Sequence, residues 1–163
     1  MKKLSALLLT LLLVLGMAAC SGNNSGTEGK SADLAKVMED MKAVLENKEM
    51  MDLGEDNLMQ NYGIDPEIVK QFAVYIDSTG LKGDEIILLE GKDEESTKTI
   101  KEMIDARYQQ KENTMKSYQP EEYAMLKECK VQQNGNYVSL IVSPQHEELE
   151  KIYTCLLYTS RCV

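Results

Sequence analysis

The chain has 163 residues, with 27 acidic side chains against 18 basic ones and a formal charge of −9. Without Lys2, Lys3 and Arg161, which lie in the two terminal segments, 15 basic residues remain against the 27 acidic ones, so residues 20–154 carry a charge of −12. This acidic balance opposes binding to nucleic acid, where lysine and arginine must replace counterions. We therefore expect no nucleic-acid partner, and the simplest role of the charge is to keep a secreted surface soluble.

The N-terminus has the pattern of a secretory signal peptide over residues 1–19. Lys2 and Lys3 are followed by an apolar stretch, Leu4 to Ala19, that only Ser5 and Thr10 interrupt. A membrane-spanning helix needs about 20 apolar residues, and this stretch ends sooner. Removal of a signal peptide therefore fits better than a retained membrane span.

The residues before the expected cleavage point, Met17-Ala18-Ala19-Cys20, resemble a bacterial lipobox, with Met17 in place of the usual leucine. We expect cleavage before Cys20 and attachment of a diacylglyceryl group to its thiol, because two buried acyl chains anchor stably where one does not. The mature protein would then be held by lipid on the extracytoplasmic face of the cell membrane. The alternative is ordinary secretory cleavage after Ala18, which leaves Cys20 as a free thiol.

Residues 20–31 form the next segment, which is rich in glycine and serine and predicts a flexible tether. From residue 32 onwards apolar side chains recur at helical spacing and predict a first helix whose stripe packs on a sheet: Leu34, Val37, Met38, Met41 and Leu45. Leu53 to Tyr62 predicts a short second helix closed by Gly63, and Asp65-Pro66-Glu67 predicts a capped helical turn.

Two pairs of strands follow from the pattern of β-branched and aromatic residues. Residues 72–76 and 84–90 predict one antiparallel hairpin, with Gly80 and Gly83 in its connection. Residues 129–132 and 137–142 predict a second hairpin around Asn134-Gly135.

A long helix is predicted between the two hairpins, from the cap Asp93 to about Ser117. One face of it carries Ile100, Met103, Ile104, Arg107, Met115 and Tyr118. At about 1.5 Å per residue this helix should extend beyond the end of the sheet, so we expect its distal half to be largely polar and solvated. Pro120 ends it, a short helix follows over residues 121–126, and Ser143-Pro144 begins a final helix. The order predicts one α+β domain, residues 32–153, with a four-stranded antiparallel sheet of two hairpins and helices packed on one face.

The last nine residues, Cys155 to Val163, read as the translation of a sequencing-library transposase adapter joined to its own reverse complement. We therefore expect residues 154–163 to be non-native and the native C-terminus to be missing. With Cys155 and Cys162 in this tail and Cys20 lipidated, Cys129 remains alone, which excludes an internal disulfide and a cysteine-based zinc site. We expect Cys129 to be a small buried residue in a strand rather than a nucleophile.

Signatures of catalysis and of metal binding are weak along the whole sequence. His146 is the only histidine, and its place beside Glu147 and Glu148 in the first turn of a helix favours a surface role. The acidic cluster Asp93-Glu94-Glu95 lies at a helix start, where the helix dipole favours negative charge. No segment has the spacing of a calcium-binding loop. We predict no catalytic, cofactor-binding or metal-binding residue, and hence a protein that is not an enzyme. Tyr118 and Tyr123 flank a turn. We expect them to anchor the helix end to the sheet rather than to recognise a partner.

Four short motifs together resemble a known family: Tyr62-Gly63-Ile64-Asp65, Asp84-Glu85-Ile86, Pro120-Glu121-Glu122-Tyr123 and Ile141-Val142-Ser143-Pro144. The chain resembles domain of unknown function family 4358 from Leu34 to Tyr153. The resemblance implies a small lipoprotein of Gram-positive gut bacteria and supplies no activity. Two hypotheses follow: a non-catalytic interaction or accessory module with an envelope protein partner, or a small-ligand binder or enzyme that uses a pocket of carboxylates and tyrosines.

Overall fold

Five antiparallel strands form one sheet in the order β1-β2-β3-β5-β4. The computed structural model describes residues 32–159. The strands are β1 (Met50–Asp52), β2 (Val69–Asp77), β3 (Glu85–Gly91), β4 (Val131–Asn134) and β5 (Tyr137–Val142). The predicted signal peptide, Cys20, the tether up to residue 31 and the tail from residue 160 lie outside the described residues.

Both predicted hairpins are confirmed, but the prediction of four strands is wrong. β2 pairs with β3 and β4 with β5, each antiparallel, and β3 joins the two hairpins by pairing with β5. The fifth strand, β1, pairs with β2 through three residues, Met50 to Asp52. It was missed because a three-residue edge strand of two methionines and an aspartate has no β-branched or aromatic residue to mark it.

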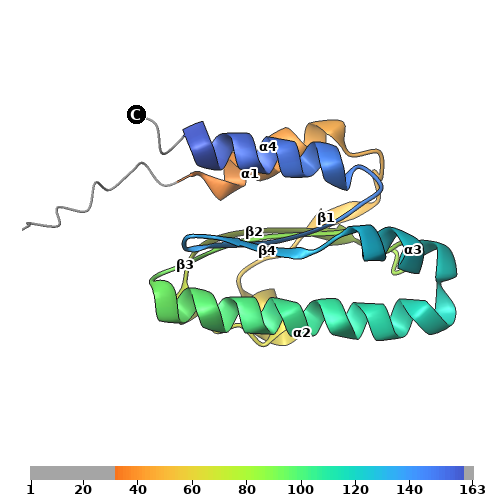
Figure 1. Cartoon of the computed structure of the whole chain (residues 1–163), viewed down its shortest axis with the longest axis horizontal. Helices are drawn as coiled ribbons and strands as arrows, with labels where there is room; N and C mark the ends of the chain where they lie inside the picture. Colours follow the sequence, from red (N-terminus) through yellow and green to blue (C-terminus); the bar gives the residue numbers. More distant parts are fainter. Residues whose placement is uncertain (1–31, 160–163) are drawn as a thin grey trace, which may run out of the picture.

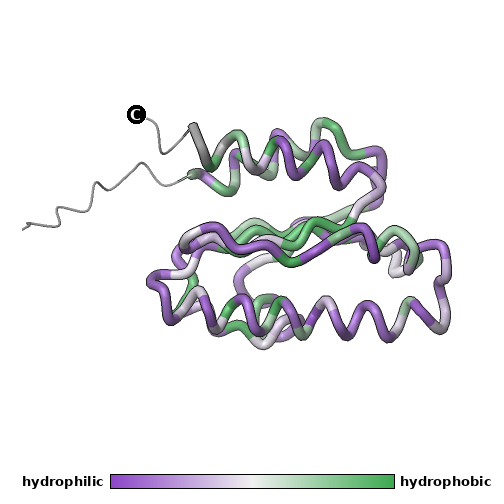
Figure 2. The backbone as a smooth tube through the Cα atoms, viewed as in Figure 1, coloured by the Kyte–Doolittle hydropathy of each residue, from purple (hydrophilic) through white to green (hydrophobic). Residues whose placement is uncertain are grey.

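The predicted placement of helices on one face of the sheet is also wrong, because helices cover both faces (Figure 1). One face packs against α1 (Leu34–Val44) and α4 (His146–Thr159). The other packs against α2 (Glu94–Tyr118), α3 (Pro120–Glu128) and the π-helical turn η1 (Leu58–Tyr62). The continuous apolar run Ile86-Ile87-Leu88-Leu89 in β3, each residue 0 % exposed, is typical of a strand buried on both sides. Figure 2 shows hydrophobic residues concentrated along the sheet between the helical layers.

The long helix α2 is confirmed with its cap, since the Asp93 carboxylate accepts a hydrogen bond from the Ser96 backbone N–H at 2.8 Å. The expectation of a largely polar, solvated distal half is confirmed, since most of residues 106–118 are exposed, although α3 lies beside α2 and Met115 is buried in the core. Of the predicted short helix over residues 53–62, the structure keeps η1, which Gly63 closes with a positive φ of 69°. The 3-10 turn η2 (Pro66–Ile68) is capped by Asp65 as predicted.

Cys129 is buried as expected but does not lie in a strand. It is the C-terminal capping residue of α3, and β4 begins only at Val131. Its sulfur lies 3.4 Å from the Met125 carbonyl oxygen, one turn back in the same helix. The last helix, α4, continues through Thr159, and Leu157 is buried against the sheet.

Ala32, the first described residue, is held to the sheet by two hydrogen bonds. The Ala32 N–H donates to the Tyr137 hydroxyl at 3.0 Å, and the Ala32 carbonyl accepts from the Gln71 side chain at 2.7 Å. Ala32 therefore lies at the end of the sheet where β3 ends and β5 begins. The β2–β3 loop and the α2–α3 turn lie at the opposite end (Figure 1). Among the described residues, no helix has both the length and the apolar character needed to cross a membrane.

Candidate functional site

A polar pocket of about 330 Å³ lies at the end of the sheet away from Ala32. It is bounded by the start of β3, the β2–β3 loop and the distal half of α2, and six of its lining residues are Glu85, Arg107, Gln110, Lys111, Thr114 and Gln119. We call it the Glu85 pocket. α2 contributes Arg107, Lys111 and Thr114 at spacings of four and three residues, which places them on one helix face.

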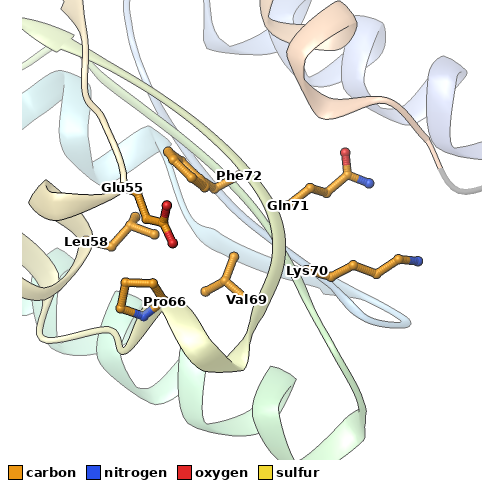
Figure 3. Close-up of a pocket in the computed structure, with 7 residues that line it drawn as sticks. All are labelled: Glu55, Leu58, Pro66, Val69, Lys70, Gln71 and Phe72. Atoms are coloured by element: carbon orange, nitrogen blue, oxygen red, sulfur yellow. The ribbon is translucent and has the colours of Figure 1, made fainter.

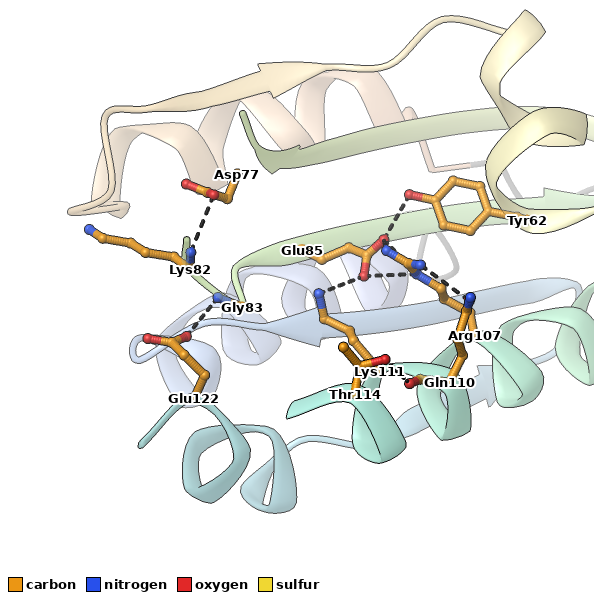
Figure 4. Close-up of polar contacts among 10 residues, drawn as sticks. All are labelled: Tyr62, Asp77, Lys82, Gly83, Glu85, Arg107, Gln110, Lys111, Thr114 and Glu122. Carbon is orange, nitrogen blue, oxygen red and sulfur yellow. Dashed lines mark hydrogen bonds and ion pairs between the residues drawn. The ribbon is translucent and has the colours of Figure 1, made fainter. Parts of the chain in front are cut away.

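Glu85 is the centre of the charged network in this pocket (Figure 4). It is the first residue of β3, and strand alternation turns it to the α2 side with Ile87 and Leu89, so that it is only 1 % exposed. Arg107 donates from Nε to both carboxylate oxygens at 3.1 and 3.2 Å, and its Nη2 lies 3.0 Å from Oε1. Lys111 Nζ lies 3.0 Å from Oε2, and the Tyr62 hydroxyl donates to Oε1 at 2.9 Å.

The electrostatics keep Glu85 ionised and Tyr62 protonated. Burial on its own raises the pKa of the Glu85 carboxyl, but the opposing charges of Lys111 and Arg107 outweigh it and hold that pKa below its ordinary value. Burial and the neighbouring Glu85 charge raise the pKa of Tyr62 well above its usual range. Neither group is therefore poised to exchange a proton near neutral pH.

Two further carboxylates contribute to the pocket wall: Asp77, the last residue of β2, and Asp84, the residue before β3. Burial raises the pKa of Asp77, but hydrogen bonds from Thr79 and Asn47 more than offset this and leave it lowered. Those bonds measure 2.7 Å to the Thr79 hydroxyl and 3.3 Å to the Asn47 amide. Asp84 is only 4 % exposed, its Oδ1 has no hydrogen-bond partner among the described residues, and burial raises its pKa.

A second pocket, of about 310 Å³, lies between η1 and the start of β2 (Figure 3). Leu58, Pro66, Val69 and Phe72 give it an apolar lining, and Glu55 is its acidic residue. Lys70 and Gln71 also line it but extend away from the other five residues in Figure 3. Its lining does not bring together opposing charges comparable to those around Glu85.

The residues that the sequence singled out for chemistry are not part of the Glu85 pocket. Burial raises the pKa of the Cys129 thiol to about 11, so the thiol stays protonated near neutral pH. His146 is partly buried at the start of α4, where Nδ1 lies 3.2 Å from the Ser143 carbonyl oxygen. Among the described residues, no three His, Cys, Asp or Glu side chains are grouped closely enough to hold a metal ion.

The two tyrosines around the α2–α3 turn behave differently. Tyr123 packs partly buried against the core and lies with its hydroxyl 3.4 Å from Glu112 Oε1, so the anchoring role predicted for it is confirmed. Tyr118 is 81 % exposed, and the same prediction is wrong for it. Leu81 is 75 % exposed, and its carbonyl oxygen accepts from the Gln119 amide at 3.1 Å. An aromatic and an aliphatic side chain are therefore exposed close to the rim of the pocket.

Sequence reasoning missed the network of Tyr62, Glu85, Arg107 and Lys111, although one signal was present. Arg107 falls in the apolar stripe of α2, where an arginine needs a carboxylate partner to be buried. Glu85 stands directly before the apolar run of β3 and was the natural candidate. The pairing of the two could not be deduced, because it depends on which face of the sheet α2 covers.

Fold and site together define a single α+β domain with a five-stranded antiparallel sheet between two helical layers and a charged pocket at one end. Residues 43–143 match the model of the family described as domain of unknown function DUF4358, and the chain belongs to that family. The matched segment is shorter than the predicted range of Leu34 to Tyr153, but it contains every residue of the Glu85 pocket. No curated protein and no solved structure matches the chain.

Proposed function

We propose that the protein is a lipid-anchored extracytoplasmic domain that works by binding an envelope component and not by catalysis. The observation that carries the proposal is the sequence Met17-Ala18-Ala19-Cys20, followed by a glycine- and serine-rich tether that leads to Ala32. Ala32 is held at one end of the sheet, and the Glu85 pocket lies at the other. A domain attached in this way would present its pocket away from the lipid.

The states of the reactive side chains support a binding role. A general acid or base needs a pKa near the working pH, whereas the pKa of Glu85 is held low and that of Tyr62 is held high. A nucleophilic cysteine needs a lowered pKa, and burial raises that of Cys129. These groups are better suited to fixed electrostatic and hydrogen-bonding roles than to proton transfer.

Replacement of the expected lipid attachment residue tests the anchor. In the native host, Cys20→Ser should stop lipid attachment and leave the precursor uncleaved. The variant should then divide between membrane and detergent fractions differently from the parent chain. Ser25→Ala, five residues further along the expected tether, is the matched control and should behave as the parent chain. Intact-mass measurement reports both the lipid and the cleavage site. Unchanged processing and unchanged membrane retention of the Cys20→Ser chain would refute the lipid anchor.

The envelope partner is tested separately by crosslinking on intact cells and recovery of the chain from solubilised native membranes. We expect a reproducible partner that is lost when Leu81 and Tyr118, the exposed side chains near the pocket rim, are both replaced by serine. If no protein is enriched over the control sample, the interaction role is wrong even if the lipid anchor is present.

The pocket favours a second candidate function, that of a small-ligand binder. Its volume of about 330 Å³ lies at the lower end of the range for organic ligands, and its lining combines cations, amides and carboxylates. Screening of the purified chain for ligands that raise its melting temperature distinguishes this role from protein recognition, because a ligand that binds only the folded state stabilises it.

A further inference from the structure

The lining of the Glu85 pocket holds equal numbers of opposite charges, three carboxylates (Asp77, Asp84 and Glu85) and three cations (Lys82, Arg107 and Lys111), but they are unevenly distributed. Two cations, Arg107 and Lys111, share the single carboxylate of Glu85, so the network carries one surplus positive charge. The residues 20–154 as a whole carry a charge of −12, with 15 basic against 27 acidic side chains. The positive surplus is therefore local to the network of Glu85, Arg107 and Lys111, where it would attract a further anion.

The acidic side chains of the pocket are buried, whereas the two cations remain partly accessible. Glu85 is 1 % exposed, Asp84 4 % and Asp77 8 %. The Arg107 side chain is 27 % exposed and that of Lys111 is 11 % exposed. The charge that a ligand entering the pocket meets first is therefore positive.

Hydrogen-bond donors remain on these cations after the internal contacts are made. Lys111 has three ammonium hydrogens, and within the described residues its ion pair is the one with Glu85 Oε2 at 3.0 Å. Arg107 Nη1 makes a long bond of 3.4 Å to the Gln110 side-chain oxygen, which leaves the Gln110 amide nitrogen as a further donor beside the cations. Thr114 lies one turn further along the same face of α2.

We propose that the Glu85 pocket binds the oxyanion group of a small organic ligand, either a carboxylate or a phosphate, with Lys111 and Arg107 as its charged donors. Glu85 acts as a positioning residue, because its bonds to both cations fix their heads at the pocket. This inference rests on the binding role proposed above and does not depend on the lipid anchor.

The test is an NMR titration of the full chain, purified in detergent, with inorganic phosphate, with acetate and with the neutral isostere acetamide. We expect saturable shifts of the backbone amides near Lys111 and Thr114 with at least one of the two anions, at millimolar concentration, and none with acetamide. Binding should weaken as salt rises, because added ions screen the attraction. A preference for phosphate or for acetate identifies which oxyanion the pocket takes.

Three variants make the test specific. Lys111→Gln removes one cation and should weaken anion binding at least tenfold, while Glu85 keeps Arg107 and Tyr62 as partners. Thr114→Glu, at an exposed position, supplies an internal carboxylate beside Lys111 and should abolish binding without disturbing the core. Thr99→Glu is the matched control, on the same helix about 22 Å away at 1.5 Å per residue, and should bind as the parent chain.

The proposal is overturned if neither anion binds, if acetamide binds as well as acetate, or if Thr114→Glu binds like Thr99→Glu. If Lys111→Gln fails to fold, the comparison of the two threonine variants still decides the matter. Absence of anion binding, together with blocked lipid attachment and altered processing of Cys20→Ser, would remove this inference and leave the lipid anchor standing.

Discussion

The most informative single residue is Glu85, a carboxylate buried at the junction of sheet and helix with two cations and a phenol around it. Glu85→Gln should lower the free energy of unfolding by about 3–5 kcal/mol, because it leaves Arg107 and Lys111 largely buried without their counter-charge. Urea denaturation measures the change. Glu112→Gln, on the helix α2 that carries Arg107 and Lys111, breaks a more exposed pair with Lys127 and should cost at most about 1 kcal/mol. Equal losses in the two variants would contradict the central role of Glu85.

The same residue predicts how stability depends on pH. Because Lys111 and Arg107 hold the pKa of Glu85 below its ordinary value of 4.5, the folded state favours the ionised form more than the unfolded chain does. This contribution is complete above about pH 4.5 and is lost as the pH falls through the lower pKa of the folded state. The difference in unfolding free energy between the parent chain and Glu85→Gln should therefore be constant near neutral pH and shrink below pH 4.5. A difference that grows on acidification would contradict the assignment.

At the scale of elements, the junction between β3 and α2, at the end of β3 away from the Glu85 pocket, is tightly packed. A Cβ added to Gly91 would lie 2.3 Å from the Thr97 Oγ1 and 2.8 Å from its backbone nitrogen, which cannot move without shifting α2. Gly91→Ala should therefore destabilise the protein by about 1–3 kcal/mol, which thermal unfolding can measure. The control is Gly54→Ala, where the nearest atom is 4.0 Å away and a change within about 0.5 kcal/mol is expected. A Gly91→Ala chain as stable as the control would mean that the junction is not tightly packed.

Local signals predicted most elements, and tertiary relations account for the errors. The cap Asp93, the Asn134-Gly135 turn and the closing Gly63 act within a few residues of chain, and each was predicted correctly. β1 is an edge strand held by pairing with β2, a relation that its own three residues do not encode. The distal half of α2 is largely exposed, as its polar sequence predicts, and its buried residue Met115 is covered by tertiary contacts. In the candidate site, the one residue whose sequence context gave a signal was Arg107. The rest of the network could not be predicted, because its residues come from three separate elements, η1, β3 and α2.

At the scale of the whole molecule, the family match and the fold have different boundaries. The matched segment, residues 43–143, contains the sheet, α2 and α3, but it excludes α4 and all but the end of α1. These two helices pack against each other and cover one entire face of the sheet. The layer that carries the Glu85 network thus lies inside the family segment, and the layer of α1 and α4 lies largely outside it.

This division predicts that residues 43–143 do not fold alone. Without α1 and α4, the side chains of Ile86, Leu88 and Ile141, each at most 2 % exposed in the complete fold, would face water as one apolar surface. Each such side chain contributes about 1.5–3 kcal/mol when it is buried, so these three alone account for about 4.5–9 kcal/mol, which is comparable to the 5–15 kcal/mol stability typical of a domain. Circular dichroism and gel filtration of residues 43–143, with residues 32–163 as the control, measure the outcome. A monomeric shorter chain with a cooperative melting transition would show that the sheet and the α2–α3 layer form a self-sufficient core.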